Sequence, residues 1–283
     1  MNKYMIPVML FGAVLTGCTD GGSYDNNTSE ARTAGVSYVC VGMETSKRFG
    51  SCPGCQLDSS RMNSFLSEKY GYPGVLLQSS QATKSAVVGE LKKAIARTPE
   101  DGLFIFYYSG HGGQEDLSSW KLSEPEGADS MDEYLCLYDT YLMDDDVWKI
   151  ISSCKGRVFC IFDCCHSQTM FRSVNIDIAM EKGMAVPLEM GMVKSSGFHF
   201  KPVGMALSTE GFRMLCWSGC LEKEYSYGSN RGGVMTNHIL SNWKKGQSYD
   251  ELWYAVKSEV NYEQPGQHPA KTQYGGGFHE VFR

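Results

Sequence analysis

Residues 103–113 read LFIFYYSGHGG, an unbroken apolar run that passes into a small polar segment around His111. An apolar run of this length, without alternating polar side chains, is typical of a strand buried on both faces of a sheet. A second run of the same kind, RVFCIF at residues 157–162, passes directly into DCCHS at residues 163–167. Two buried strands are therefore predicted, each with a reactive side chain just beyond its carboxyl end.

Strand-like and helix-like segments alternate along the rest of the chain. The strand-like segments are 36–42, 74–77, 103–108, 157–162, 214–218 and 280–282, and the helix-like segments are 58–70, 82–97, 145–152, 234–243 and 249–260. This alternation predicts an α/β domain in which about six strands form a mostly parallel sheet with helices on both faces. The segment 173–213 has little periodicity, which predicts a long loop.

The composition is that of a globular protein with a substantial core. The chain has 283 residues, of which 42% are hydrophobic and 20% are charged. Its formal net charge is -6. Because phosphate binding needs basic patches, this acidic balance argues against nucleic acid as a partner.

The amino-terminal segment has the pattern of a targeting signal. Residues 1–17 contain a short apolar stretch that cannot span a bilayer, and LTGC follows at residues 15–18. This sequence resembles a bacterial lipobox, which implies cleavage before Cys18 and lipidation of that residue; an ordinary signal peptide is the alternative. Residues 18–34 are polar and predict a flexible tether. We therefore expect a domain anchored by lipid to a membrane of the bacterial cell envelope, periplasmic or surface-facing.

The two motifs after the buried strands suit nucleophilic catalysis. Ligands bind at the carboxyl ends of the strands in open α/β sheets, so His111 and Cys165 are expected to lie close together. The imidazole would take the thiol proton, and the thiolate would attack a carbonyl carbon. The backbone N–H groups of Gly112 and Cys165 are candidates for the oxyanion hole. Either motif alone is compatible with a turn or a core cysteine, but both together favour a catalytic pair.

Both motifs resemble those of metacaspases and their bacterial relatives, which are peptidases of the caspase fold. Residues 108–112 match the family's YSGHG, and residues 163–167 match its D-x-C-H-S. The second match puts the nucleophile at Cys165 rather than Cys164. The histidine precedes the cysteine by about 50 residues, which is the caspase order and the reverse of the papain order.

The resemblance covers most of residues 36–283 and implies a domain organisation. It divides a peptidase domain at 35–283 into a p20-like part at 35–172, the loop at 173–213 and a p10-like part at 214–283. Weaker matches to the family are CQLD at 55–58, DEYL at 132–135, DDD at 144–146, SGC at 218–220 and GVMT at 233–236. The family is often monomeric, so we expect a monomer.

The caspase signature QACRG is absent, and Asp163 stands at its glutamine position. The resemblance therefore implies cleavage after Arg or Lys, with Cys55, Asp58, Ser109 and Asp163 in the S1 pocket. Carboxylates in such a pocket favour a cationic side chain through charge-assisted hydrogen bonds. We expect protein or peptide substrates with Arg or Lys at P1. The alternative for Asp58 is a helix N-cap.

Calcium is implied by only part of the family pattern. Arg172 stands where calcium-dependent members carry an aspartate. Gln168 stands where the family as a whole usually has a glycine. Calcium needs several oxygen ligands, and an arginine repels it. We therefore expect no required cofactor; Asp132, Asp144 and Asp145 are the candidate metal ligands, although negative charge also suits a helix start.

The resemblance also implies self-cleavage in or next to the long loop. Basic residues there are Arg172, Lys182, Lys194 and Lys201.

Three other functions stay open. The chain could be a catalytically inactive caspase-like binding module, or a peptidase of the clostripain or gingipain type. It could also be a redox protein that uses Cys52 and Cys55. This CxxC has no second motif at zinc-finger spacing, and it is not predicted to open a helix as thioredoxin-type sites do.

Overall fold

The computed structural model describes residues 35–116, 131–166, 193–195, 211–221 and 224–283. Within these residues, eight strands form the main sheet: β1 (Val36–Gly42), β2 (Gly74–Gln78), β3 (Leu103–Asp116), β4 (Met131–Cys136), β5 (Tyr141–Met143), β6 (Arg157–His166), β8 (Arg213–Ser218) and β11 (Ala270–Tyr274). A small second sheet contains β7 (Val193–Ser195), β9 (Tyr225–Ser229) and β10 (Gly232–Gly233).

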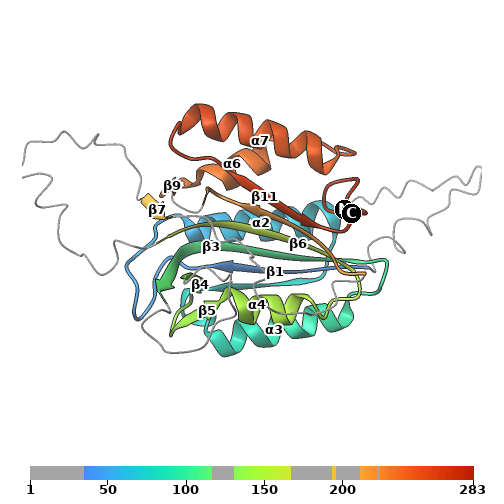
Figure 1. The fold of residues 1–283 in the computed structure, drawn as a ribbon, viewed down its shortest axis with the longest axis horizontal. Coiled ribbons are helices and arrows are strands. Elements are labelled where there is room, and N and C mark those ends of the chain that lie inside the picture. The colour runs from blue at the N-terminus through green and yellow to red at the C-terminus, as the bar shows by residue number, and fades with distance from the viewer. Residues whose placement is uncertain (1–34, 117–130, 167–192, 196–210, 222–223) are drawn as a thin grey trace, which may run out of the picture.

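The main sheet lies between two layers of helices (Figure 1). Its strand order is β11-β8-β6-β3-β1-β2, and β11 is the antiparallel strand of this path. The helices are α2 (Cys55–Tyr70), α3 (Lys84–Arg97), α4 (Asp144–Ile151), α6 (Val234–Asn242) and α7 (Tyr249–Glu263), with a short 3-10 turn, η1, at Ser79–Gln81. The predicted α/β fold, with a mostly parallel sheet and helices on both faces, is confirmed.

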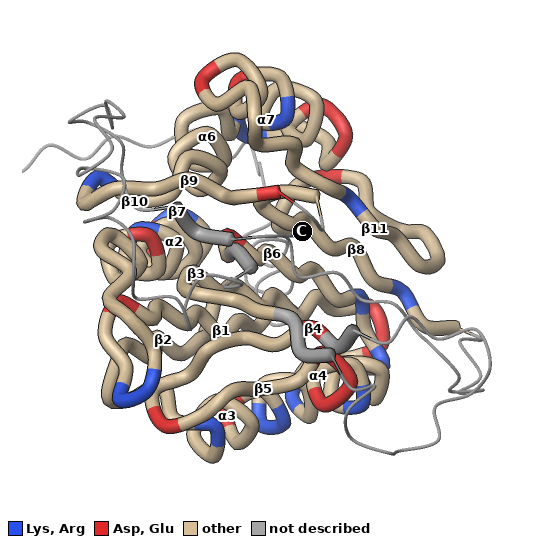
Figure 2. Tube along the Cα trace, turned by 60° about the vertical axis from the view of Figure 1, so that its left-hand side comes forward, with Lys and Arg blue, Asp and Glu red and all other residues tan. Residues whose placement is uncertain are grey.

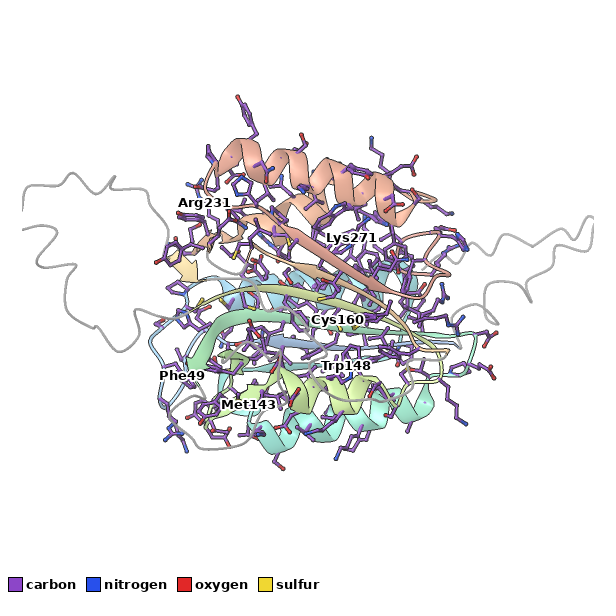
Figure 3. The ribbon with its side chains drawn as sticks, viewed as in Figure 1. Phe49, Met143, Trp148, Cys160, Arg231 and Lys271 are labelled. Carbon is purple, nitrogen blue, oxygen red and sulfur yellow. The ribbon has the colours of Figure 1, made fainter. Side chains whose placement is uncertain are left out.

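The core consists of two apolar clusters, one on each face of the sheet. One packs β1, β3 and β6 against α3 and α4, and the other packs the same strands against α2, α6 and α7. β3 is buried from Leu103 through Gly113, because β1 and β6 flank it and helices cover both its faces. Figure 3 shows Cys160 of β6 in the middle of the sheet and Trp148 below it on α4. The continuous apolar runs predicted as buried strands are therefore the central strands.

The helix α3 illustrates how the apolar pattern fixes this packing. Thr83 caps it, since its side chain accepts a hydrogen bond from the Ala86 N–H. One face of the helix is apolar: Val87, Leu91 and Ile95 are buried against the sheet. Residues three and four apart share a helix face, so these side chains pack as one stripe.

Truncating this stripe should destabilise the fold measurably. Leu91 is fully buried, so Leu91→Ala should lower the free energy of unfolding by about 2–5 kcal/mol. Lys92→Ala on the exposed face of the same helix should change it by no more than about 0.5 kcal/mol. Urea unfolding monitored by circular dichroism measures both values. Equal effects of the two substitutions would contradict the assigned face.

The first residues of α2 differ from the prediction. The helix begins at Cys55 rather than Asp58, so the CxxC motif does stand at a helix start, and the contrary expectation was wrong. Its N-cap is Gly54, whose φ of 91° lies in the left-handed region that glycine tolerates best. Asp58 is therefore not the N-cap. Its carboxylate instead contacts residues that lie much later in the sequence.

The predicted last strand at 280–282 is wrong. These residues form only an isolated bridge between Glu280 and Ser248, and the edge strand is β11, ten residues earlier in the chain. Phe282 has a φ of 60°, which is incompatible with an extended strand, and its carbonyl accepts a hydrogen bond from the buried Tyr72 hydroxyl. Its apolar character reflects core packing rather than sheet pairing.

The predicted signal segment 1–17, the tether 18–34 and most of the loop 173–213 lie outside the described residues, although Val193–Ser195 forms β7. In the described ranges, no helix combines the length and apolar character needed to cross a bilayer. Basic and acidic residues are interspersed along the coloured tube in Figure 2. Such mixing of signs weakens any long-range field that would steer a polyanion.

Candidate active site

The carboxyl ends of β3 and β6 bring the two motifs together. The two strands are parallel, and their register pairs Ser109 with Asp163 and His111 with Cys165. Neighbouring strands lie about 4.8 Å apart, so the two predicted catalytic positions are direct backbone neighbours. Figure 3 places Phe49 and Arg231 at this same end of the molecule, where the arrow of β3 ends. Loops from both halves of the chain therefore reach the edge that carries the motifs.

His111 is oriented by a backbone carbonyl group. Its side chain is largely buried, at 9% exposure, and Nε2 lies 3.2 Å from the carbonyl oxygen of Ser51. Because a carbonyl oxygen only accepts hydrogen bonds, this contact requires the proton on Nε2. The lone pair of the neutral imidazole is then on Nδ1, which is the atom that can act as a base. No sequence pattern predicts the role of Ser51, because its contribution is a main-chain atom.

The backbone around His111 is held by Tyr108. The hydroxyl of this buried tyrosine lies 2.7 Å from the carbonyl oxygens of both His111 and Cys136. Burial raises the pKa of Tyr108, so the hydroxyl stays protonated and can donate. A Cβ at Gly110 would come within 2.5 Å of this hydroxyl oxygen. The glycine of the SGHG motif is thus required by the tyrosine two residues earlier.

Asp58 is a fully buried carboxylate that joins three distant parts of the chain. Its Oδ2 accepts a hydrogen bond from the Ser109 hydroxyl at 2.8 Å. The backbone N–H of Gly233 lies 2.9 Å from both carboxylate oxygens. Donors of this kind stabilise the ionised form of a buried acid. Two predicted S1 residues, Asp58 and Ser109, are therefore in direct contact.

Asp163 is the second fully buried carboxylate at this edge. Its Oδ1 accepts from the Ser226 hydroxyl at 3.0 Å, and its Oδ2 accepts from the Thr236 N–H at 3.0 Å and the Thr236 hydroxyl at 2.6 Å. The Tyr107 hydroxyl lies 2.7 Å from the Thr236 hydroxyl. The match at 233–236 pointed to this segment, but the roles of Thr236 and Ser226 were missed.

The buried Gln267 side chain fixes the segment that supplies one of these donors. Its Nε2 donates to the Gly219 carbonyl at 2.8 Å and to the Ser226 hydroxyl at 3.0 Å. Its Oε1 accepts from the Tyr227 N–H at 2.9 Å. Through Ser226, this amide orients the hydrogen bond received by Asp163.

The remaining predicted S1 residue is Cys55, which is buried and lies one helical turn before Asp58. The predicted set thus forms a connected group: Cys55 and Asp58 share α2, Asp58 contacts Ser109, and Ser109 pairs with Asp163 across the sheet. Two carboxylates and two small polar groups at one edge suit recognition of a positively charged group.

The remaining predicted positions are the oxyanion-hole residue Gly112 and the candidate metal ligands. Gly112 lies within β3, where it pairs with His166 on β6 and Leu135 on β4. Asp144 is buried at the start of α4, and its Oδ1 accepts from the Asp145 N–H at 2.8 Å. Among the described residues, no three His, Cys, Asp or Glu side chains are grouped to hold a metal ion. The predicted positions Cys18, Arg172, Lys182 and Lys201 lie outside the described residues.

Metacaspases are among the proteins that resemble this chain. Metacaspase-1A of Aspergillus oryzae is 26% identical over 275 residues, which cover 79% of this chain and 64% of that protein. Metacaspase-1 of Botryotinia fuckeliana is 26% identical, over 88% of this chain and 70% of the relative. Metacaspase-1 of Sclerotinia sclerotiorum is 31% identical, over 78% of this chain and 62% of the relative. The chain thus spans about two thirds of the length of these three relatives.

Solved structures support the same fold. A protein from Geobacter sulfurreducens has a crystal structure that superposes with a TM-score of 0.63 at 21% identity, covering 86% of this chain and 94% of that one. The structure of pro-sf-caspase-1 gives a TM-score of 0.52 at 10% identity, covering 92% and 94% of the two chains. The Peptidase C14 family model, described as the caspase domain, matches residues 40–275. That match spans both strand motifs, Asp58 and the segments that donate hydrogen bonds to Asp58 and Asp163, and the chain belongs to the caspase-domain family.

Proposed function

We propose that the chain is a cysteine endopeptidase that uses His111 as its base and Cys165 as its nucleophile. The observation that carries this proposal is the parallel register of β3 and β6, which pairs these two residues at the carboxyl edge of the sheet. Membership of the caspase-domain family supports a peptidase of the cysteine type.

The reaction follows from the orientation of His111. With Nε2–H directed at the Ser51 carbonyl, Nδ1 takes the proton of the Cys165 thiol, and the thiolate attacks the scissile carbonyl carbon. The N–H groups of Gly112 and Cys165 stabilise the resulting oxyanion. The imidazolium then protonates the leaving amine, and a water molecule, deprotonated by the same nitrogen, hydrolyses the thioester.

We further propose that cleavage follows Arg or Lys. The support is the pair of buried side chains of Asp58 and Asp163, whose carboxyl oxygens accept hydrogen bonds from backbone and hydroxyl donors. Carboxylates at this edge favour a guanidinium or ammonium group at P1 through charge-assisted hydrogen bonds. An Asp side chain at P1 would instead be repelled.

The experiment that tests both parts is the turnover of fluorogenic peptides that differ only in P1, which is Arg, Lys, Gln or Asp. The proposal expects kcat/KM to be highest for Arg or Lys and lowest for Asp. A preference for Asp would retain the peptidase but overturn the pocket. Failure to cleave any peptide or an unstructured protein substrate would favour a catalytically inactive binding module.

The proposed peptidase needs no metal ion. Support comes from Arg172, which stands where calcium-dependent relatives carry an aspartate, and from Asp144, whose carboxylate binds the first turn of α4. Turnover should therefore change by no more than about twofold between excess EGTA and millimolar calcium. An increase of more than about tenfold on adding calcium would contradict this expectation.

The proposed setting is a lipid-anchored monomer that processes itself between its two parts. The support is the lipobox-like sequence before Cys18 and the basic residues of the segment 172–201. Cys18→Ala should move the protein from the membrane fraction to the soluble fraction.

Active protein should convert on incubation to two fragments, whereas the Cys165→Ala chain should stay intact.

A further inference from the structure

Two thiols lie next to the loop that orients His111. The Sγ atoms of Cys52 and Cys55 are 2.8 Å apart, and both side chains are fully buried. Both residues are present as thiols in this structure. The separation of the two sulfurs exceeds the length of a disulfide bond by only about 0.8 Å.

The loop that carries these thiols is held in a defined turn. The Cys55 N–H donates to the Cys52 carbonyl at 3.3 Å, and the Gly54 N–H donates to the Glu44 carboxylate at 3.3 Å. Gly54 adopts the left-handed conformation that lets the chain enter α2. The backbone therefore already has a shape that brings the two sulfurs together.

One peptide group connects the thiol pair to the catalytic base. The Ser51 carbonyl and the Cys52 N–H belong to the same planar peptide unit. Its carbonyl oxygen lies 3.2 Å from His111 Nε2, and its N–H donates to the Glu44 carbonyl at 2.8 Å. Any constraint on Cys52 is therefore a constraint on the direction of the carbonyl that orients His111.

We propose that Cys52 and Cys55 form a reversible disulfide that fixes the loop holding the Ser51 carbonyl against His111. The thiol pair also stands at the start of α2, the helix that carries Asp58. Closing the pair thus stabilises two parts of the site at once. The disulfide itself is independent of the proposed peptidase function, and only its effect on His111 rests on that function.

Oxidation requires a disulfide-containing partner, for which oxidised glutathione is the simplest case. One cysteine thiolate attacks a sulfur of the oxidant and releases one reduced thiol, forming a mixed disulfide. The other thiolate attacks the protein sulfur of that mixed disulfide and releases the second reduced thiol. Two protein thiols are oxidised and one external disulfide is reduced, so atoms and electrons balance. Gly50 and Ser51 are exposed, so a small opening of this loop gives the oxidant access.

Other thiols in the described part of the chain provide a contrast. Cys160 lies in the centre of β6, and Cys136 lies at the end of β4. Burial raises the pKa of both thiols, which keeps them protonated and slow to react. Oxidation at moderate potential should therefore leave Cys136 and Cys160 as thiols.

The test uses the full-length Cys165→Ala chain, so that no active nucleophile competes and no activity is needed. The protein is equilibrated in glutathione buffers of increasing oxidised fraction, quenched in acid, alkylated and mapped by mass spectrometry. We expect a linked Cys52–Cys55 peptide that returns to two alkylated thiols in reducing buffer, while Cys136 and Cys160 remain alkylated throughout. In the same samples, backbone amides of residues 44–58 should exchange hydrogen more slowly in the oxidised form.

The matched control is the double variant with Cys52→Ser and Cys165→Ala, whose hydrogen exchange in this segment should not depend on the redox buffer. Full alkylation of both thiols in the most oxidising buffer would overturn the proposal, as would linkage to a different cysteine. A disulfide that forms without slowing exchange in residues 44–58 would overturn its role in fixing the loop. None of these outcomes depends on whether the wild-type chain cleaves peptides.

Discussion

Replacing Cys165 with alanine is expected to lower kcat/KM for an Arg peptide by about 10⁴-fold or more, because the side chain that forms the covalent intermediate is lost. His111→Ala should cause a loss of similar size, since the two residues act as one unit and their effects do not add. The measurement is initial-rate hydrolysis of the fluorogenic Arg peptide, with circular dichroism to verify that each variant is folded.

The neighbouring cysteine provides the matched control for this prediction. Cys164 is fully buried and pairs with Gly110 across the strands, one position before the proposed nucleophile. Cys164→Ala should keep kcat/KM within about tenfold of wild type, because it removes one small buried group and no reacting atom. The assignment of the nucleophile is wrong if Cys164→Ala is inactive while Cys165→Ala retains turnover.

The central strands could be predicted from the sequence because burial on both faces requires a continuous run of apolar residues. β3 and β6 are covered on both faces, so their residues are apolar without alternation, and each run ends in one of the two proposed catalytic motifs. β11 has no such apolar run. It is an edge strand of sequence AKTQY whose burial alternates between exposed and half-buried, and its register is set by β8 rather than by its own composition. The short sequence EVF at 280–282 predicts a strand instead, but it forms only an isolated bridge.

Only the site residues that belong to short sequence motifs could be predicted. The proposed catalytic pair and the two carboxylates stand in short local patterns, and the fold brings them to one edge of the sheet. The donors that hold the carboxylates come from far along the chain: Gly233 is 175 residues from Asp58, and Thr236 is 73 residues from Asp163. A backbone N–H or carbonyl group, such as that of Ser51, is carried by almost any residue type. Such contacts depend on tertiary structure and leave no pattern in the sequence.

Selection of the P1 cation by Asp163 can be separated from a contribution of Asp163 to folding. The measurement compares turnover of two peptides that differ only in the P1 residue. Arg and citrulline have nearly the same shape, but only Arg is charged. Asp163→Asn keeps the size of the side chain and removes its negative charge. The ratio of kcat/KM for the Arg peptide to that for the citrulline peptide should therefore fall by about 10- to 100-fold, because one charge-assisted hydrogen bond contributes a free energy of this size. The same variant should also lose about 1–3 kcal/mol of stability, because the new amide group faces donors from Thr236 and Ser226.

Ser226→Ala is the control that keeps the charge. It removes one hydrogen bond to Asp163 and leaves both hydrogen bonds from Thr236 in place. Turnover of both peptides should fall together in this variant, and the ratio should stay within about threefold of wild type because the attraction for the cation is retained. If Asp163→Asn lowers turnover of Arg and citrulline peptides equally, then Asp163 supports the fold of the site and does not select the P1 cation. In that case Asp58, held by Ser109 and the Gly233 N–H, is the carboxylate on which the same pair of peptides should next be compared.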